Sequence, residues 1–161
     1  MSKELYIFGT GAHARKVFHC ATQAGYAVKA FVDENRGVHA PTGSLPVMSP
    51  ETLKTMPVVG DMIIAIGDSK VRQRLMDEYF ECGWRLPPIV HPKASVAPDA
   101  VLEDGVLIAA GALVESGSII GRGTIVDIGV VVDHDCMIAP FSHLRPGVVC
   151  QSCTQWLGEN L

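Results

Sequence analysis

Aliphatic residues recur at intervals of six along the second half of the chain, and this period limits the possible folds most strongly. A small or β-branched residue follows each of them four positions later. The two series are Val90, Val96, Leu102, Ile108, Val114, Ile120, Val126, Val132, Ile138 and Leu144, and Ala94, Ala100, Val106, Ala112, Ser118, Thr124, Val130, Cys136, Ser142 and Val148. A six-residue period is typical of a parallel β-helix, whose stacked coils of short strands and corners bury the aliphatic residues. The pattern therefore predicts an all-β domain of hexapeptide repeats over residues 87–150.

The position directly after each aliphatic residue supports the same fold. It is mostly small or acidic, as in Glu103, Ala109 and Asp127, which completes the usual hexapeptide pattern of a left-handed β-helix. Most domains of this kind carry acyltransferase chemistry. The predicted fold therefore already favours that class of function.

Residues 1–86 follow a different pattern, in which apolar runs alternate with segments of helical spacing. Strands are expected at residues 5–8, 27–32 and 62–66. A short helix is expected to begin with Ser49 as N-cap and Pro50 at the first helical position. The helix after the third strand is expected to bury Val71, Leu75, Tyr79 and Cys82. This alternation predicts a small parallel sheet with right-handed crossovers, a Rossmann-like α/β domain.

A glycine-rich turn, Gly9-Thr10-Gly11, lies between the first strand and the first helix. It is a truncated dinucleotide fingerprint, with Ala14 in place of the last glycine, and would bring a phosphate to backbone N–H groups at the helix N-terminus. Asp33 ends the second strand, where a carboxylate can accept hydrogen bonds from a ribose or a base. Because the domain is short, a nucleotide-sugar is a better ligand than a dinucleotide. The alternative is a glycine turn that only lets the strand meet the helix.

The segment Asp133-His134-Asp135-Cys136 is the strongest candidate for catalysis. A carboxylate on one ring nitrogen of a histidine fixes the tautomer and raises the basicity of the other nitrogen, so His134 is a candidate general base. The alternative is an exposed turn histidine. His143 follows nine residues later, half of an 18-residue coil. We therefore expect the two histidines on different faces of one subunit, where they could converge across a subunit boundary.

No metal site is expected. The γ-class carbonic anhydrases, zinc enzymes built on a left-handed β-helix, use a closely spaced histidine pair that the spacing of His134 and His143 does not match. A metal-dependent hydratase on the same fold therefore stays a minor alternative. Cys150 and Cys153 have CxxC spacing, but a four-ligand zinc site needs a second such pair. We interpret them as two buried or edge thiols.

Composition excludes other classes of function. The net charge of −4 and the absence of a basic run argue against nucleic-acid binding. No stretch approaches the roughly 18 apolar residues of a membrane-spanning helix, so no membrane insertion is expected. Five irregularly spaced cysteines do not form a disulfide framework. A cytoplasmic, reducing location is the expectation.

The ordered combination of motifs resembles one family. These motifs are Gly9-Thr10-Gly11-Ala12-His13-Ala14-Arg15, Ala65-Ile66-Gly67-Asp68, His91-Pro92 before Ala94, Asp133-His134-Asp135-Cys136 and Phe141-Ser142-His143. Together they are similar to the sialic acid O-acetyltransferase and bacterial UDP-amino-sugar N-acetyltransferase family. The resemblance spans residues 3 to about 150.

The resemblance implies an acetyl-CoA-dependent sugar acetyltransferase that works as a homotrimer, with active sites between subunits. It implies that His134 removes a proton from the attacking amine or hydroxyl while Asp135 orients the ring. It places His143 near the acetyl group and a backbone N–H near Ser152 at the thioester oxygen. The positions implied for the nucleotide-sugar or sialic-acid-type substrate are Gly9, Gly11, Ala12, His13, Asp33, Gly67 and Asp68.

The sequence departs from the family pattern at its C-terminal end. Family members carry further coils after the segment matching Cys150, whereas here Trp156 stands at an aliphatic position. We therefore expect residues 151–161 to form a degenerate tail. An alternative function follows: a shortened relative that binds a nucleotide-sugar without transferring acetyl.

Overall fold

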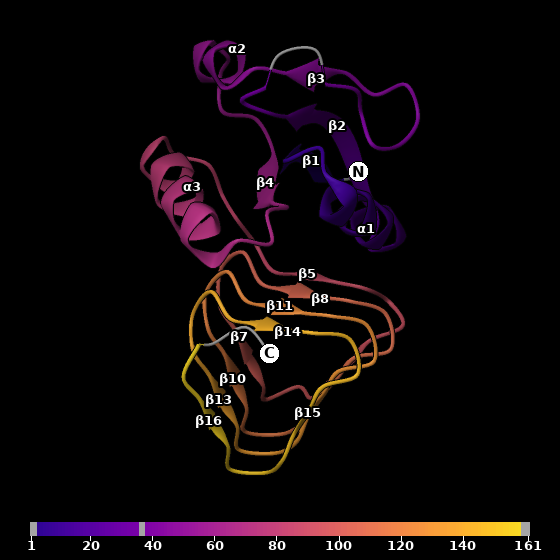
Figure 1. Cartoon of the computed structure of the whole chain (residues 1–161), viewed down its shortest axis with the longest axis vertical. Coiled ribbons are helices and arrows are strands. Elements are labelled where there is room, and N and C mark those ends of the chain that lie inside the picture. The colour runs from indigo at the N-terminus through magenta and orange to yellow at the C-terminus, as the bar shows by residue number, and fades with distance from the viewer. Residues whose placement is uncertain (1–2, 36–37, 159–161) are drawn as a thin grey trace. The chain divides into compact units, whose positions relative to one another are not determined.

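The computed structural model describes residues 3–35 and 38–158 (Figure 1). The chain divides into two compact units, Met1–Leu86 and Pro87–Leu161. Each unit is built around its own sheet or sheets. Within the described residues, no helix is long and apolar enough to cross a membrane.

The first unit is a four-stranded parallel sheet in the order β3-β2-β1-β4 (Figure 1). Its strands are β1 (Lys3–Phe8), β2 (Tyr26–Val32), β3 (Val47–Met48) and β4 (Asp61–Ile64). The predicted parallel α/β domain is thus confirmed. The sequence did not predict β3, because its two residues are too short to show a period. It pairs with the end of β2, where Phe31 lies opposite Val47.

Among the described residues, two helices connect these strands and a third follows β4. They are α1 (Ala12–Gln23), α2 (Pro50–Thr55) and α3 (Ser69–Glu81). The predicted cap of α2 is confirmed, since Ser49 Oγ accepts a hydrogen bond from the Thr52 N–H at 3.2 Å. Asp68 caps α3 in the same way, with its carboxylate accepting from the Val71 N–H at 2.9 Å.

The buried face of α3 differs from the predicted one. Leu75 and Tyr79 are buried as expected, but Val71 and Cys82 are exposed. The remaining buried positions of the helix are Arg72 and Met76. The pattern of apolar residues predicted the wrong face because it took Arg72 to be exposed. Arg72 is buried, and its guanidinium donates to two backbone carbonyls, those of Ile66 and Gly67, each at 2.8 Å.

The second unit is a β-helix of three parallel sheets with four strands each. One sheet contains β5 (Ile89–Val90), β8 (Leu107–Ile108), β11 (Ile125–Val126) and β14 (His143–Leu144). The second contains β6 (Ser95–Val96), β9 (Leu113–Val114), β12 (Val131–Val132) and β15 (Val149–Cys150). The third contains β7 (Val101–Leu102), β10 (Ile119–Ile120), β13 (Met137–Ile138) and β16 (Gln155–Trp156).

The coil length follows from the strand pairing. Val101 pairs with Ile119, and Ile119 with Met137, so equivalent positions lie 18 residues apart. Three six-residue units therefore complete one coil, as the period predicts.

The predicted aliphatic series forms the core of the β-helix. From Ile108 to Leu144 every member of the series is buried, and Val90, Val96 and Leu102 are partly buried and pack against this core. The series of small residues lines the same core. Ser118 and Thr124 are polar, and they can be buried because their hydroxyls donate to the carbonyls of Asp133 and Ala139.

The β-helix continues beyond Cys150, into the segment where we expected a degenerate tail. Strand β16 pairs in parallel with β13, and Trp156 lies opposite Ile138. Thr154 occupies the small corner position and donates its hydroxyl to the Gln151 carbonyl at 2.6 Å. An indole therefore replaces an aliphatic side chain while the strand and its corner are kept, so residues 151–156 are part of the last coil.

Candidate functional site

The glycine turn and the turn after β4 lie at the same edge of the N-terminal sheet. Gly9 follows β1, and Ala65 follows β4, the neighbour of β1 in the sheet. The chain passes from β1 to β2 on one side and later places β4 on the other, so the strand order reverses at β1. Ligands of open parallel sheets bind at such a switch point, beyond the carboxyl ends of the strands.

Gly9 is required by both conformation and space. Its φ is +112°, and a Cβ there would lie 2.9 Å from Ile66 Cδ1 and 3.0 Å from the Ala65 carbonyl oxygen. Gly11 is the N-cap of α1 and provides no side-chain cap. The first residues of that helix are Ala12 and His13. The predicted phosphate-binding residues therefore lie together in the turn and the first turn of α1.

Asp33 lies at the end of β2, beside the glycine turn. One carboxylate oxygen, Oδ2, accepts a hydrogen bond from Thr10 Oγ1. The other, Oδ1, accepts from the backbone N–H of Asn35 at 2.8 Å and from its side-chain amide at 3.0 Å. The carboxylate thus ties two loops of the sheet edge together, a role that the sequence did not predict. Oδ1 thus uses both of its lone-pair sites, whereas Oδ2 uses one and keeps acceptor capacity for a ligand, because a carboxylate offers about four such sites.

Gly67 and Asp68 form the turn between β4 and α3. Asp68 is the N-cap of α3, which is a structural role. The buried guanidinium of Arg72 binds the Gly67 carbonyl and fixes the turn. Burial lowers the pKa of Arg72 to about 10, and the negative charge of Asp68 opposes that shift. The side chain therefore stays a cation at neutral pH, next to the edge where a nucleotide phosphate is expected.

His134 lies in the turn between β12 and β13, on the β-helix. Its side chain is 54% exposed, and Nδ1 lies 2.8 Å from Asp135 Oδ2. The backbone N–H of His134 donates to Asp133 Oδ1 at 2.8 Å, which fixes the start of the turn. With Nδ1 held by a carboxylate, Nε2 is the ring nitrogen left to exchange a proton with a substrate.

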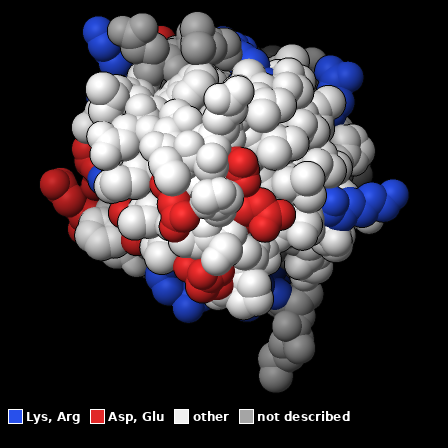
Figure 2. All heavy atoms as spheres, turned by 90° about the horizontal axis from the view of Figure 1, so that it is seen from below, with Lys and Arg blue, Asp and Glu red and all other residues white. Residues whose placement is uncertain are grey.

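The pKa of His134 is raised above its ordinary value. The hydrogen bond to Asp135 is the largest cause, and the negative charges of Asp133, Asp135 and Glu115 add to it. Figure 2 shows the molecule from below, with acidic side chains grouped on a surface whose centre is otherwise mainly uncharged. Such surroundings favour the protonated ring and also attract a cationic group such as an amine.

Asp135 has a left-handed backbone conformation, with φ +57°. Most turns of the β-helix place a glycine at this point of the six-residue unit, among them Gly111, Gly117, Gly123, Gly129 and Gly147. The exceptions with positive φ are Asp135, Phe141 and Cys153. A non-glycine residue in this conformation costs of order 1–3 kcal/mol, and such strain clusters at functional sites. The exception at Asp135 therefore agrees with a functional role.

The turn of the following coil stacks directly on the His134 turn. The backbone N–H of Cys153 donates to the His134 carbonyl at 3.0 Å, and Ser152 precedes it on the exposed surface. Ligand atoms of His134, Asp135 and Cys153 lie within 4.8 Å of one another. Of the CxxC pair, which we interpreted as two buried or edge thiols, Cys150 is buried and Cys153 is exposed. The sequence did not place the latter beside the candidate base.

His143 belongs to a different sheet. It lies in β14 and is buried, with Nε2 at 3.4 Å from the buried carboxylate oxygen Oδ2 of Asp127. Asp127 also accepts the backbone N–H of Ile128 at 2.7 Å. Within one chain the structure therefore groups Ser152 with His134, and places His143 in a separate buried pair.

Comparisons with known proteins identify the family. A family model described as the PglD N-terminal domain matches residues 4–79. A histidine mutant of perosamine N-acetyltransferase from Caulobacter crescentus, solved with CoA and GDP-perosamine, is 31% identical with a TM-score of 0.84, over 91% of this chain and 73% of that one. The chain belongs to the bacterial hexapeptide-repeat sugar N-acetyltransferases.

Two further solved structures are similar to this chain. The acetyltransferase domain of PglB from Neisseria gonorrhoeae FA1090, in complex with acetyl coenzyme A, is 28% identical with a TM-score of 0.82, over 92% of this chain and 73% of that one. WeeI from Acinetobacter baumannii AYE is 21% identical with a TM-score of 0.79, over 91% and 71% of the two chains, and shows the fold alone. The predicted family, left-handed β-helix and acetyltransferase class are confirmed.

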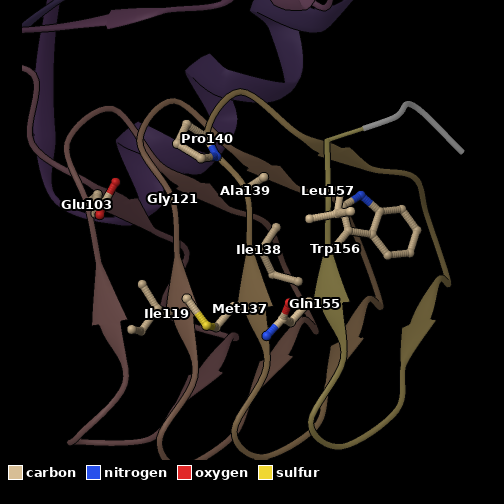
Figure 3. Close-up of a pocket in the computed structure, with 10 residues that line it drawn as sticks. All are labelled: Glu103, Ile119, Gly121, Met137, Ile138, Ala139, Pro140, Gln155, Trp156 and Leu157. Carbon is tan, nitrogen blue, oxygen red and sulfur yellow. The ribbon is translucent and has the colours of Figure 1, made fainter.

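A pocket that the sequence did not predict lies on the sheet of β7, β10, β13 and β16 (Figure 3). Its volume is about 250 Å³. It is lined by Glu103, Ile119, Gly121, Met137, Ile138, Ala139, Pro140, Gln155, Trp156 and Leu157. The lining is mainly aliphatic and aromatic, which suits an apolar part of a ligand. None of the turn residues around His134 belongs to it.

Proposed function

We propose that this chain transfers the acetyl group of acetyl-CoA to the amino group of a nucleotide-linked sugar, with His134 as general base. The observation that carries the proposal is the ordered pair of His134 and Asp135 on a hexapeptide-repeat sugar acetyltransferase fold. In the similar structures, CoA and GDP-perosamine are bound by perosamine N-acetyltransferase, and acetyl coenzyme A by PglB. These ligands support the same two substrate classes here.

In this reaction the amine nitrogen attacks the carbonyl carbon of the thioester, and His134 Nε2 takes a proton from it. The new C–N bond forms while the C–S bond breaks, and CoA leaves as a thiolate that regains a proton. Asp135 holds Nδ1, so the imidazolium that forms is stabilised by an adjacent negative charge. The raised pKa of His134 makes the ring a stronger base.

The acidic surroundings favour an amine over a hydroxyl acceptor. The charges of Asp133, Asp135 and Glu115 act on His134, and they attract a cationic ammonium group to the same turn. A neutral hydroxyl gains nothing from this attraction. N-acetylation is therefore the reaction that the site supports best.

We propose that the nucleotide binds at the carboxyl edge of the N-terminal sheet. Backbone N–H groups of the glycine turn and the α1 N-terminus would hold the diphosphate, at Gly9, Gly11, Ala12 and His13. Asp33 would accept hydrogen bonds from the ribose or base. Gly67 and Asp68 would form the opposite wall, in a turn held by the Asp68 cap of α3 and by the Arg72 guanidinium.

We propose that the active unit is a homotrimer. The outward positions of two sheets carry exposed aliphatic side chains, Leu113 and Val149 on one and Val101 and Met137 on the other. Apolar side chains exposed on the face of a sheet are typical of protein interfaces. The exposed Ser152, beside the His134 turn, would then help to line an acetyl-CoA site at the subunit boundary, whereas the buried His143 lies in the remaining sheet, that of β14. A cytoplasmic location fits the absence of a disulfide among the five cysteines, all of which are described.

Replacing Asp135 with asparagine should change the pH dependence of the reaction. The base must be neutral to act, so kcat/KM rises as pH rises through the pKa of His134. The hydrogen bond to Asp135 is the largest cause of the raised pKa. In Asp135→Asn the acidic limb of kcat/KM should therefore move to lower pH, while the rate on the plateau falls. An unchanged acidic limb, measured by thiol release between acidic and neutral pH, would exclude Asp135 as the partner of the base.

Replacing Asp33 with asparagine should weaken nucleotide-sugar binding. A hydrogen bond to a charged group contributes about 1.5–3 kcal/mol, so Kd should rise roughly 10- to 100-fold. Isothermal titration with the nucleotide-sugar measures this. Glu34→Gln is the matched control, because Glu34 is an exposed neighbouring carboxylate that lies 3.4 Å from the Arg74 guanidinium. If Asp33→Asn and wild type bind the nucleotide-sugar with equal affinity, the nucleotide does not bind at Asp33.

Thiol release from acetyl-CoA, measured with a panel of nucleotide-linked amino sugars, tests the proposal. Matched nucleotide-sugars that carry a hydroxyl in place of the amine are the control. Release that depends on the amine supports N-acetylation, and equal release with the hydroxyl compounds would indicate O-acetylation. Nucleotide-sugar binding without any release would favour the alternative, a relative that binds its ligand without transferring acetyl.

A further inference from the structure

The turn of residues 115–118 lies one coil before the His134 turn and contacts it directly. The backbone N–H of Asp135 donates to the Ser116 carbonyl at 2.9 Å. Gly117 is the residue 18 positions before Asp135, at the equivalent point of its own coil, with φ +73°. The two left-handed turn residues are therefore stacked on each other.

Space is the feature that sets Gly117 apart. A Cβ at this position would lie 2.4 Å from Asp135 Oδ1 and 3.3 Å from its Cγ. Real Cβ atoms do not approach an oxygen so closely. The other oxygen of the same carboxylate, Oδ2, binds His134 Nδ1 at 2.8 Å. The carboxylate that holds the candidate base thus fills a volume that only a glycine leaves open.

The backbone around Gly117 is itself held in place. Ser116 Oγ donates to Asp99 Oδ2 at 2.7 Å, and the Gly117 N–H also donates to the Asp99 carboxylate. A methyl group at 117 would therefore be carried by a fixed turn and would meet the end of a flexible side chain, the Asp135 carboxylate. The side chain of Asp135 is the part that would move, and it would move away from the position that orients His134.

We propose that Gly117 is a positioning residue for the catalytic base: its missing Cβ leaves the space in which the Asp135 carboxylate holds the His134 ring. The inference rests on the proposed role of His134 as general base. Gly117 does not touch the substrate or the reacting atoms. It acts through Asp135, and Asp99 braces the turn that carries it.

The chain offers a matched control in Gly129. This residue occupies the same position of the six-residue unit, with φ +64°, and a Cβ there would meet no atom within 4 Å. Gly117→Ala and Gly129→Ala therefore carry the same left-handed backbone strain, but only the first displaces a carboxylate. The unfolding temperatures of the two variants should fall by similar amounts, because the flexible Asp135 side chain can move aside with little loss of stability.

Activity should separate the two variants. A misplacement of about 1 Å costs roughly 100-fold in rate, so kcat/KM of Gly117→Ala should fall by that order while Gly129→Ala stays close to wild type. The acidic limb of kcat/KM should also move to lower pH in Gly117→Ala alone. The groups that face His134 are Asp133, Asp135, Glu115 and Cys153, and only the contact with Asp135 is changed.

An NMR titration of the His134 ring gives a readout that does not need turnover. Its pKa should be lower in Gly117→Ala than in wild type and unchanged in Gly129→Ala. In an Asp135→Ala background, Gly117→Ala should have no further effect on that pKa. A wild-type ring pKa in Gly117→Ala would overturn the inference whatever the activity. If wild type transfers no acetyl but the ring pKa shifts as stated, the proposed function fails and the positioning role stands.

Discussion

His134→Ala is expected to lower kcat for acetyl transfer by about 100- to 10,000-fold, the usual contribution of a positioned general base. The ring is half exposed and hydrogen-bonds to Asp135 at the surface. Its removal should therefore leave the fold intact. Thiol release from acetyl-CoA measures the rate, and circular dichroism and sedimentation verify the fold and assembly.

His134→Gln and His91→Ala complete this test. Glutamine keeps a polar side chain without the basicity, so it should be as inactive as alanine. His91 lies at the start of the β-helix, and its Nδ1 accepts the backbone N–H of Lys93 at 3.0 Å. Its replacement should leave kcat near the wild-type value. A fully active His134→Ala would contradict the assignment of the base.

Ile120→Ala should lower the free energy of unfolding by about 2–5 kcal/mol, the usual cost of emptying a buried isoleucine or leucine site. Ile120 is fully buried in β10, between Leu102 and Ile138 of the adjacent coils. Because the coils stack rigidly, neighbouring side chains have little freedom to fill the cavity. Denaturant unfolding at fixed protein concentration measures the change.

Ile128→Ala is the matched control for this prediction. Its side chain is 48% exposed, so the free energy of unfolding should change by no more than about 0.5 kcal/mol. The chain has two tryptophans, of which Trp156 reports on the β-helix. A Trp84→Phe background isolates its fluorescence. Equal losses at both isoleucines would contradict a core built from the six-residue aliphatic series.

The β-helix could be predicted from the sequence because each coil repeats the same requirement. Every sixth side chain faces the core, so Val114, Val126 and Val132 reveal the fold without any long-range information. The strand β3 could not be found, since it consists of two residues that pair only because β2 lies beside them. The last coil was missed because Trp156 interrupts the aliphatic series, although Thr154 still occupies the small corner position.

The candidate site was only partly readable. Local sequence pairs His134 with Asp135, because a turn brings consecutive side chains together. Gly117 and Cys153 approach them through coil stacking, at a separation of 18 residues. One signal was nevertheless present: Asp135 and Cys153 stand where most units carry glycine. The roles of Asp33 as a link to Thr10 and of Arg72 as a brace for Gly67 depend on tertiary contacts that no local pattern contains.

The central claim is acetyl transfer from acetyl-CoA to the amine of a nucleotide-linked sugar. Mass analysis of the sugar product, after incubation with acetyl-CoA labelled in the acetyl group, tests it most directly. The account predicts a product heavier by one labelled acetyl group on the amino nitrogen, formed by wild type and not by His134→Ala. Unchanged sugar after incubation with a nucleotide-sugar that demonstrably binds the chain would contradict it.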